Sequence, residues 1–358
     1  MRMSTLGRTV LGRTVLGRTV LGRTVLGRTV LGLIVLASFT PARAAGETLF
    51  AVAGSPTAGV AVGDGVILFS STIHQFWDAA TGADSTLAYT AVVTTPTGFV
   101  ACADDGSIWV STTQTGNVFV RRSQPSTLPL RGMTAVGSSI LAVGDGGTIL
   151  RSQDANYTTW TTQTSPVATD LYAVTGNGLT TVAVGAGGVI LKGGSTGTGW
   201  QVVSVSESRD FYGVSDNAPN GQYLAVGAGG AMWRGLGDGV TWTNISGLTL
   251  EDLRATVSIG NPAGQSALIV GGSGVIFYSN GGYTNWTEAN SPSREDLSGV
   301  AFTGNDLVAV GANTTTLWSQ VGLVWSLTVV PADPISWGSL KARYHSEGRA
   351  TQERRLAR

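Results

Sequence analysis

The sequence LAVGDGGTILRS at residues 141–152, followed by Trp160, decides the fold of this chain of 358 residues. Two apolar runs flank a glycine-rich turn, and glycine adopts the positive φ values that tight hairpins need. The apolar and small residues alternate with the period of a strand rather than of a helix. The stretch therefore predicts two short strands joined by a tight hairpin.

Variants of this stretch recur seven times, at spacings of 40–44 residues. The third residue of the Ala-Val-Gly signature is, in chain order, Gly63, Ala103, Gly144, Gly185, Gly227, Gly271 and Gly311. A bulky aromatic residue follows each copy: Trp77, Phe119, Trp160, Trp200, Trp242, Trp286 and Trp325. An Ala-Val-like pair precedes each copy. Three landmarks that repeat in one order at this period are typical of the blades of a propeller.

Each repeat has room for four strands of about five residues, which is the size of one propeller blade. A single blade leaves both of its faces unpacked, whereas a closed ring of blades packs every face against a neighbour. We therefore predict an all-β fold, a seven-bladed β-propeller of four-stranded antiparallel blades, over residues 46–330. Without a spare outer strand before Glu47, the ring should close by packing of the last blade against the first.

Residues 1–45 precede the repeats and predict a signal peptide. The pentapeptide Leu-Gly-Arg-Thr-Val is repeated from Leu6 to Val30, and an apolar run and the small-x-small site Ala42-Arg43-Ala44 follow it. The repeat is either a tandem expansion in the coding sequence or an unusually long basic n-region. Because the apolar run is shorter than the roughly 20 residues that span a bilayer, we expect export to the periplasm or the extracellular space without a stable membrane anchor.

Residues 331–358 follow the repeats and differ from them in composition. They contain few apolar residues and six basic ones, namely Lys341, Arg343, Arg349, Arg354, Arg355 and Arg358. We predict a solvated, disordered basic tail, and the alternative is a specific binding arm.

The formal net charge of zero hides an acidic middle of the chain. Residues 47–333 contain 20 acidic and nine basic residues, which gives a net charge of −11. An acidic surface argues against binding to a nucleic acid backbone. The single cysteine, Cys102, is expected to be a buried small side chain. The two histidines, His74 and His345, form no cluster with metal-ligand spacing, and we predict neither a metal nor a cofactor.

A candidate binding site follows from the geometry of a propeller. In several repeats an acidic residue stands just before the first strand: Asp170, Asp210, Asp252 and Asp296. At the fourth position of the same strands stand Phe50, Thr90, Thr134, Tyr172, Tyr212, Arg254 and Ser298. These side chains would surround the mouth of the central channel and bind a cationic peptide or protein segment. In the alternative interpretation, each aspartate only caps its own turn.

The full repeat pattern resembles a known family. Asp-Leu-x-x-Val, then Ala-Val-Gly-x-x-Gly-x-Ile-x-x-Ser, is followed by a turn and a tryptophan, and residues 152–160 resemble an Asp-box, with looser copies at 238–242 and 279–286. Over residues 47–330 the pattern resembles the photosystem II stability/assembly factor-like propellers and, more loosely, the sialidase-type Asp-box repeats. The first resemblance implies an assembly factor that binds a protein subunit.

The second resemblance implies a carbohydrate-active hydrolase. Such sialidase-like enzymes use a tyrosine nucleophile with a glutamate partner, an aspartate that acts as the acid, and three arginines that bind the carboxylate of the substrate. Candidates here are Tyr172, Tyr212, Glu207, Arg131, Arg209, Arg234, Arg254 and Arg294, although no catalytic motif of the family matches them. We therefore predict an exported, monomeric, non-enzymatic binding or assembly scaffold for a protein or peptide, with the hydrolase as the alternative.

Overall fold

The computed structural model describes residues 47–328 apart from 73–75, 218–220, 262–263, 282, 305, 321 and 323. The predicted signal peptide, the basic tail and both histidines lie outside the described residues. Within the described part of the chain, no helix is long and apolar enough to cross a membrane.

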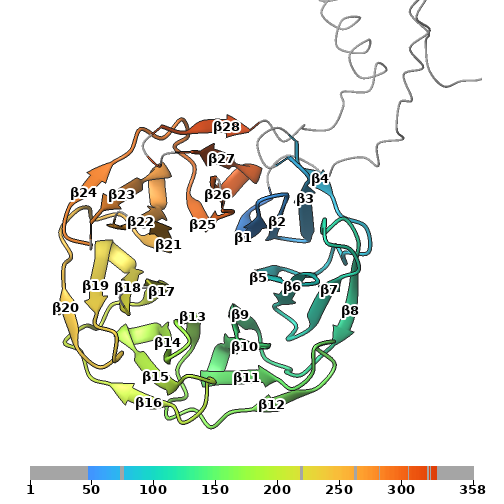
Figure 1. The fold of residues 1–358 in the computed structure, drawn as a ribbon, viewed down its shortest axis with the longest axis horizontal. Coiled ribbons are helices and arrows are strands. Elements are labelled where there is room, and N and C mark those ends of the chain that lie inside the picture. The colour runs from blue at the N-terminus through green and yellow to red at the C-terminus, as the bar shows by residue number, and fades with distance from the viewer. Residues whose placement is uncertain are drawn as a thin grey trace, which may run out of the picture. The chain divides into compact units, whose positions relative to one another are not determined.

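Seven four-stranded antiparallel sheets form a ring (Figure 1). Each sheet consists of four strands that are consecutive in sequence, and we number these sheets as blades one to seven in chain order. The first strand of each blade lies at the centre of the ring and the fourth at its edge (Figure 1). The predicted seven-bladed propeller of four-stranded blades is thus confirmed.

The strands have the following bounds. Blade one consists of β1 (Leu49–Ser55), β2 (Ala58–Gly63), β3 (Val66–Ser70) and β4 (Asp78–Ala79), and blade two of β5 (Tyr89–Thr95), β6 (Gly98–Ala103), β7 (Ile108–Ser111) and β8 (Phe119–Ser123). Blade three consists of β9 (Leu130–Val136), β10 (Ser139–Gly144), β11 (Thr148–Ser152) and β12 (Trp160–Thr162), and blade four of β13 (Leu171–Gly176), β14 (Thr180–Gly185), β15 (Ile190–Gly194) and β16 (Gln201–Val203). Blade five consists of β17 (Phe211–Asn217), β18 (Gln222–Gly227), β19 (Ala231–Gly235) and β20 (Trp242–Asn244). Blade six consists of β21 (Leu253–Asn261), β22 (Gly264–Gly271), β23 (Ile276–Asn280) and β24 (Trp286–Glu288), and blade seven of β25 (Leu297–Phe302), β26 (Leu307–Gly311), β27 (Thr316–Ser319) and β28 (Ser326–Thr328).

The core lies between neighbouring blades rather than within one of them. Val182 and Val184 of blade four, for example, share a buried cluster with Phe211 and Tyr223 of blade five. All six residues of β14 are buried, because this strand is covered on both faces. Each blade therefore depends on two neighbours for the burial of its apolar surface.

The ring closes by packing, as predicted. Leu49 and Val52 of blade one share a buried cluster with Val308 and Val310 of blade seven. No strand is exchanged between the two sheets, since both are built from consecutive strands.

The tryptophan at or just before the start of the fourth strand closes the turn before it. In blades three to seven the indole Nε1 donates to the carbonyl oxygen of the residue three positions earlier, at 3.0–3.2 Å. That earlier residue always has a positive φ, and the five residues are Tyr157, Gly197, Gly239, Tyr283 and Gly322. In blade three, Asp154 also accepts the backbone N–H groups of Asn156 and Thr159, at 2.8 and 2.7 Å.

The glycine of the Ala-Val-Gly signature is needed for a close backbone approach. The φ of Gly227 is −171°, an extended value that any residue can adopt. A Cβ atom at this position, however, would lie 1.9 Å from the carbonyl oxygen of Asp210, which precedes the first strand of the same blade. The glycine thus lets the start of the first strand cross the end of the second.

We expect Gly227→Ala to lower the free energy of unfolding by about 1–3 kcal/mol, because the backbone must move to make room. The matched control is Gly194→Ala, where the nearest atom to the new Cβ would be 3.4 Å away. The control should change stability by less than about 0.5 kcal/mol. Equal losses for the two variants in denaturant titrations would contradict this explanation.

Candidate functional site

A β-bulge at the start of every innermost strand directs one side chain into the central channel. In blade four, Leu171 pairs with Gly185 and Ala173 with Val184, so Tyr172 is the extra residue. Bulges commonly redirect a side chain in this way. The seven extra residues, which we call the bulge residues, are Phe50, Thr90, Arg131, Tyr172, Tyr212, Arg254 and Ser298.

The channel is lined by the bulge residue and the next two residues of each blade. The residue after the bulge residue is always alanine or glycine. At Gly132 a Cβ would lie 2.7 Å from the carbonyl oxygen of Tyr172 in the next blade, so small residues let adjacent innermost strands approach each other. The third residue is mostly apolar: Val52, Val92, Met133, Val174, Val214, Thr256 and Val300. The channel therefore has polar and aromatic side chains at its mouth and a largely apolar wall behind them.

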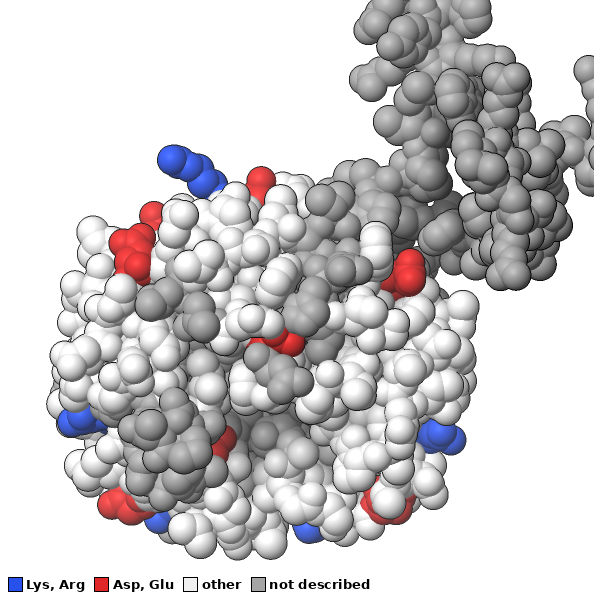
Figure 2. Space-filling view, turned by 45° about the horizontal axis from the view of Figure 1, so that its top comes forward, with Lys and Arg blue, Asp and Glu red and all other residues white. Residues whose placement is uncertain are grey.

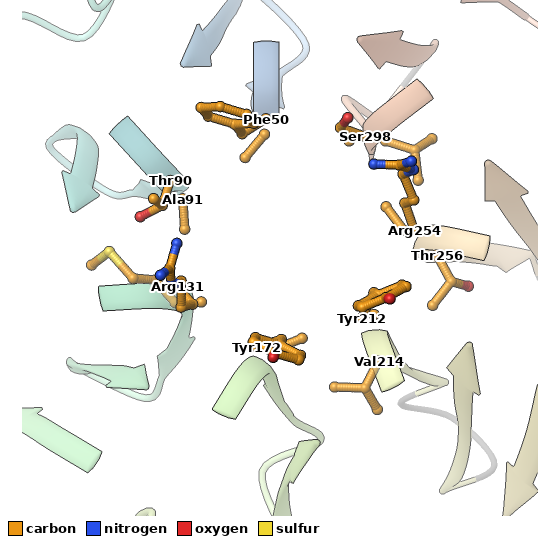
Figure 3. Close-up of a pocket in the computed structure, with 18 of the residues that line it drawn as sticks. Phe50, Thr90, Ala91, Arg131, Tyr172, Tyr212, Val214, Arg254, Thr256 and Ser298 are labelled. Carbon is orange, nitrogen blue, oxygen red and sulfur yellow. The ribbon is translucent and has the colours of Figure 1, made fainter. Parts of the chain in front are cut away.

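The polar side of the mouth is formed by four consecutive blades. Arg131, Tyr172, Tyr212 and Arg254 follow one another around the channel, and the guanidinium groups of the two arginines turn along its rim toward the blades on either side (Figure 3). The centroids of the two tyrosine rings are 5.9 Å apart and the rings are inclined at 46°. An aromatic pair thus lies between two guanidinium groups on one side of the channel.

The prediction for blade three was wrong. Thr134 was expected at the mouth, but β9 begins at Leu130 and its bulge residue is Arg131. Thr134 lies farther along the strand and pairs with Leu141. The sequence Arg131-Gly132-Met133 differs from the Ala-Val-like landmark, and the alignment shifted to Thr134-Ala135-Val136, which matches it better.

The four predicted aspartates lie just outside the cavity lining, two positions before the bulge residues. Each one connects two turns between second and third strands. The carboxylate Oδ1 atoms of Asp170, Asp210, Asp252 and Asp296 accept the backbone N–H groups of Gly146, Gly187, Gly229 and Ser273 in the preceding blade, at 2.8–2.9 Å. Their backbone carbonyl oxygens accept an N–H group from the turn of their own blade, at 2.8–2.9 Å. We call this pair of bonds the aspartate clamp.

The aspartate clamp changes the capping interpretation. An aspartate that only capped its own turn would direct its carboxylate to that turn, yet the carboxylate bonds to the neighbouring blade. The other carboxylate oxygen of Asp170, Asp210 and Asp252 has no hydrogen bond to the described residues. These three groups can therefore stabilise the ring and still present negative charge at the mouth.

The electrostatics of the tyrosines reflect this charge. Burial, and then the negative charges of Asp210 and Asp170, raise the pKa of Tyr172 above its usual value. Burial, and then Asp252 and Asp210, raise the pKa of Tyr212. Both hydroxyls therefore remain neutral at physiological pH, next to carboxylates that favour a cation.

Both arginines of the mouth are paired with carboxylates. Arg131 donates from Nε and Nη2 to Asp145, at 2.7 and 2.9 Å. Arg254 donates from Nη2 to Oδ2 of Asp296, at 2.9 Å. Each of these two pairs is neutral, so Asp170, Asp210 and Asp252 give this side of the mouth a net negative charge.

The groups considered for a hydrolase are not assembled in one place. Of the candidate arginines, two line the channel, Arg131 and Arg254. Glu207 is bonded to Arg209 and to the indole of Trp233, and the hydrogen bonds from Arg209 bring its pKa down to about 2. Within the described residues, neither tyrosine of the mouth forms a hydrogen bond with a glutamate.

Cys102, the single cysteine, is completely buried. Burial raises the pKa of its thiol to about 12, so it remains an uncharged packing group, as expected. In the described part of the chain, no group of three or more His, Cys, Asp or Glu side chains could hold a metal ion.

Comparisons with known proteins show the fold. No family model matches the sequence, and no curated protein is significantly similar to it. Among solved structures, the computationally designed protein Ika8 has a TM-score of 0.59 and 14% identity, over 83% of this chain and 90% of its own.

Two structures of YCF48 are also similar. YCF48 bound to D1 peptide has a TM-score of 0.64 and 16% identity, over 76% of this chain and 93% of its own. YCF48 from Cyanidioschyzon merolae has a TM-score of 0.62 and 14% identity, over 76% of this chain and 96% of its own. At such identities a likeness shows the fold alone. The propeller fold of these two structures agrees with the fold that the sequence predicts.

The aspartate clamp predicts different effects for two substitutions of one residue. Asp210→Ala removes the acceptor for the N–H of Gly187 and should lower the free energy of unfolding by about 1–2 kcal/mol. Asp210→Asn keeps an Oδ1 acceptor and should cost less than half as much. Equal effects of the two substitutions in thermal or denaturant unfolding would show that the bond to the preceding blade contributes nothing.

Asp216 lies near the end of β17 and does not line the channel. Its burial leads us to predict a pH-dependent effect on stability. Burial raises its pKa above 3.8, although the hydroxyl of Thr175 donates to it at 2.6 Å. A raised carboxyl pKa destabilises the fold at pH values above the folded pKa and has no effect below the unfolded pKa. Asp216→Asn should therefore raise the unfolding temperature at pH 7, with a gain that disappears below pH 3.8.

The control for this prediction is Asp78→Asn on the exposed edge strand β4, which should change little at either pH. If Asp216→Asn destabilised the protein equally at both pH values, burial of the charge would not be the cause.

Proposed function

We propose that this chain is an exported, non-enzymatic binding or assembly scaffold that takes a protein or peptide partner at the mouth of its central channel. The partner presents a cationic segment there. The chain acts as a monomer in the periplasm or the extracellular space, without a metal, cofactor, nucleic acid or membrane anchor.

One observation carries the proposal. The tyrosine pair lies next to the carboxylates of Asp170, Asp210 and Asp252, and each of these has one oxygen without a hydrogen bond to the described residues. The faces of Tyr172 and Tyr212 can attract an ammonium or guanidinium group, and such contacts contribute about 0.5–2 kcal/mol. Asp170, Asp210 and Asp252 add charge on the same side of the channel. Tyr172 and Tyr212 are positioned by bulges in paired strands, so their side chains lose little conformational entropy when a ligand binds.

The size of the channel favours a segment over a folded partner inside it. The cavity volume is about 190 Å³, which suits one extended side chain and not a folded domain. A protein partner would therefore place one exposed segment at the mouth and rest on the surrounding turns. The similarity in fold to YCF48 bound to D1 peptide supports a propeller that holds a peptide.

The non-enzymatic part of the proposal is supported by how the candidate catalytic groups are used. Glu207 and Arg209 form an ion pair at 2.8 Å that also holds Trp233 of strand β19. Arg131 and Arg254 are each held by a carboxylate. These groups are committed to positioning turns and strands, whereas a sialidase-like site needs arginines that converge on a substrate carboxylate.

The test uses a fluorescent nonapeptide of alternating glycine and lysine, with a glutamate version as the control peptide. The lysine peptide should bind the chain, as measured by fluorescence anisotropy, and the glutamate peptide should not. The double variant Asp170→Asn and Asp210→Asn should weaken binding at least about tenfold, because it removes two charges beside Tyr172. Its stability should fall little, since asparagine keeps both backbone bonds.

The matched control removes two charges elsewhere, by Asp78→Asn and Glu288→Gln on edge strands β4 and β24. This control should bind the lysine peptide as the unmodified chain does, at about 150 mM salt, where long-range attraction is screened. Equal loss in both double variants would mean that binding reflects only net charge. Absence of binding to any of the three proteins would overturn the proposed cationic partner.

A further inference from the structure

We propose that the basic segment at residues 334–358 of this same chain occupies the mouth of the channel and that a partner must displace it. The inference rests on the proposed function, because it takes the mouth to be a site for cationic segments. It adds an internal competitor for that site. Topology, reach and charge support it.

The topology places the last described residue on the face where the mouth opens. In each blade the first strand runs away from the mouth, and the three antiparallel strands that follow alternate in direction. The fourth strand therefore runs back toward the mouth face. β28 (Ser326–Thr328) is the fourth strand of blade seven, so the chain leaves it on the mouth face.

The propeller itself shows how many residues are needed to reach the mouth from an outer strand. In blade four the outer strand β16 ends at Val203, and seven residues later Asp210 forms its aspartate clamp beside the channel. The first basic residue after β28 is Lys341, thirteen residues beyond Thr328. Every basic residue of the segment is therefore within reach of the mouth.

The charges of the segment and the mouth are opposite. Residues 334–358 contain six basic and two acidic residues, a net charge of +4. The described part of the chain is acidic, and Figure 2, which shows the face of the ring away from the mouth, has acidic side chains near the centre of that face too. At the mouth, Asp170, Asp210 and Asp252 form no ion pair with the described residues, in contrast to Asp145 and Asp296.

Tethering makes even a weak interaction effective. A segment joined by a short linker experiences an effective concentration of about 1 mM at its site. A segment that bound with a dissociation constant of about 0.1 mM would then occupy the mouth about nine-tenths of the time and weaken a competitor about tenfold. Only a partner with higher affinity would gain access.

The experiment uses the full chain and two variants with six substitutions each. In the first, the six basic residues of the segment become glutamine: Lys341, Arg343, Arg349, Arg354, Arg355 and Arg358. In the matched control, the same six positions keep their positive charge, because Lys341 becomes arginine and the five arginines become lysine. The probe is a labelled synthetic peptide with the sequence of residues 334–358, read by fluorescence anisotropy.

We expect the probe to bind the first variant about tenfold more tightly than the unmodified chain, and the control variant no more tightly than the unmodified chain. Equal binding to all three proteins would overturn the internal competitor and leave the proposed function intact. If the control variant gained as much affinity as the first, the positive charge of the segment would not hold it at the mouth, and the proposal would fail. If the probe bound none of them, while the glycine-lysine peptide did, the segment would not be a ligand of the mouth.

A zero-length carbodiimide cross-link gives a second readout. Lys341 is one of two lysines in the chain, and an amide between its amine and Asp170, Asp210 or Asp252 would be identified by mass spectrometry. The cross-link should persist in Asp78→Asn and disappear when all three mouth aspartates are asparagine. In a mixture of ¹⁵N-labelled and unlabelled chains it should join peptides of the same label. Mixed-label products would overturn occupancy within one molecule and indicate exchange between copies.

Discussion

The structure depends on one close backbone contact that is repeated around the ring. The start of each innermost strand crosses the end of the second strand, and the residue at the crossing is glycine in six blades and Ala103 in blade two. This crossing brings the carbonyl oxygen before the first strand to the turn of its own blade. It also leaves the first strand with one residue more than its partner, and that residue turns into the channel.

Scaffold and site are largely separate sets of residues, although the aspartates of the clamp belong to both. The crossing residues, which are glycine or alanine, the small residues after each bulge and the buried second strands are restricted by packing. The bulge residues face open space and differ from blade to blade, from Ser298 to Tyr212 and Arg254. A ring of this kind can acquire a binding site on one side without any change in backbone, because the bulges set the direction of the side chains and leave their chemistry free.

The fold was predictable from sequence because its causes are local and repeated. The alternation of apolar residues, the glycine turns and the tryptophans specify strands and hairpins, and their period specifies blades. The parts that were missed are non-local. Arg131 was missed because a bulge is defined by the pairing of two strands. The sequence of the first strand alone does not show it, and Thr134-Ala135-Val136 matches the repeat better. The bond from Asp210 to Gly187 was missed because it joins two blades, although the position of the aspartates before the first strand was visible.

The most direct test of the account is a crystal structure of the chain with the tail charges neutralised and the lysine peptide bound. The account predicts one lysine ammonium at the mouth, beside the rings of Tyr172 and Tyr212 and within about 2.7–3.2 Å of a carboxylate oxygen of Asp170 or Asp210. Electron density for the peptide on the outer strands or on the opposite face, with the mouth empty, would contradict it.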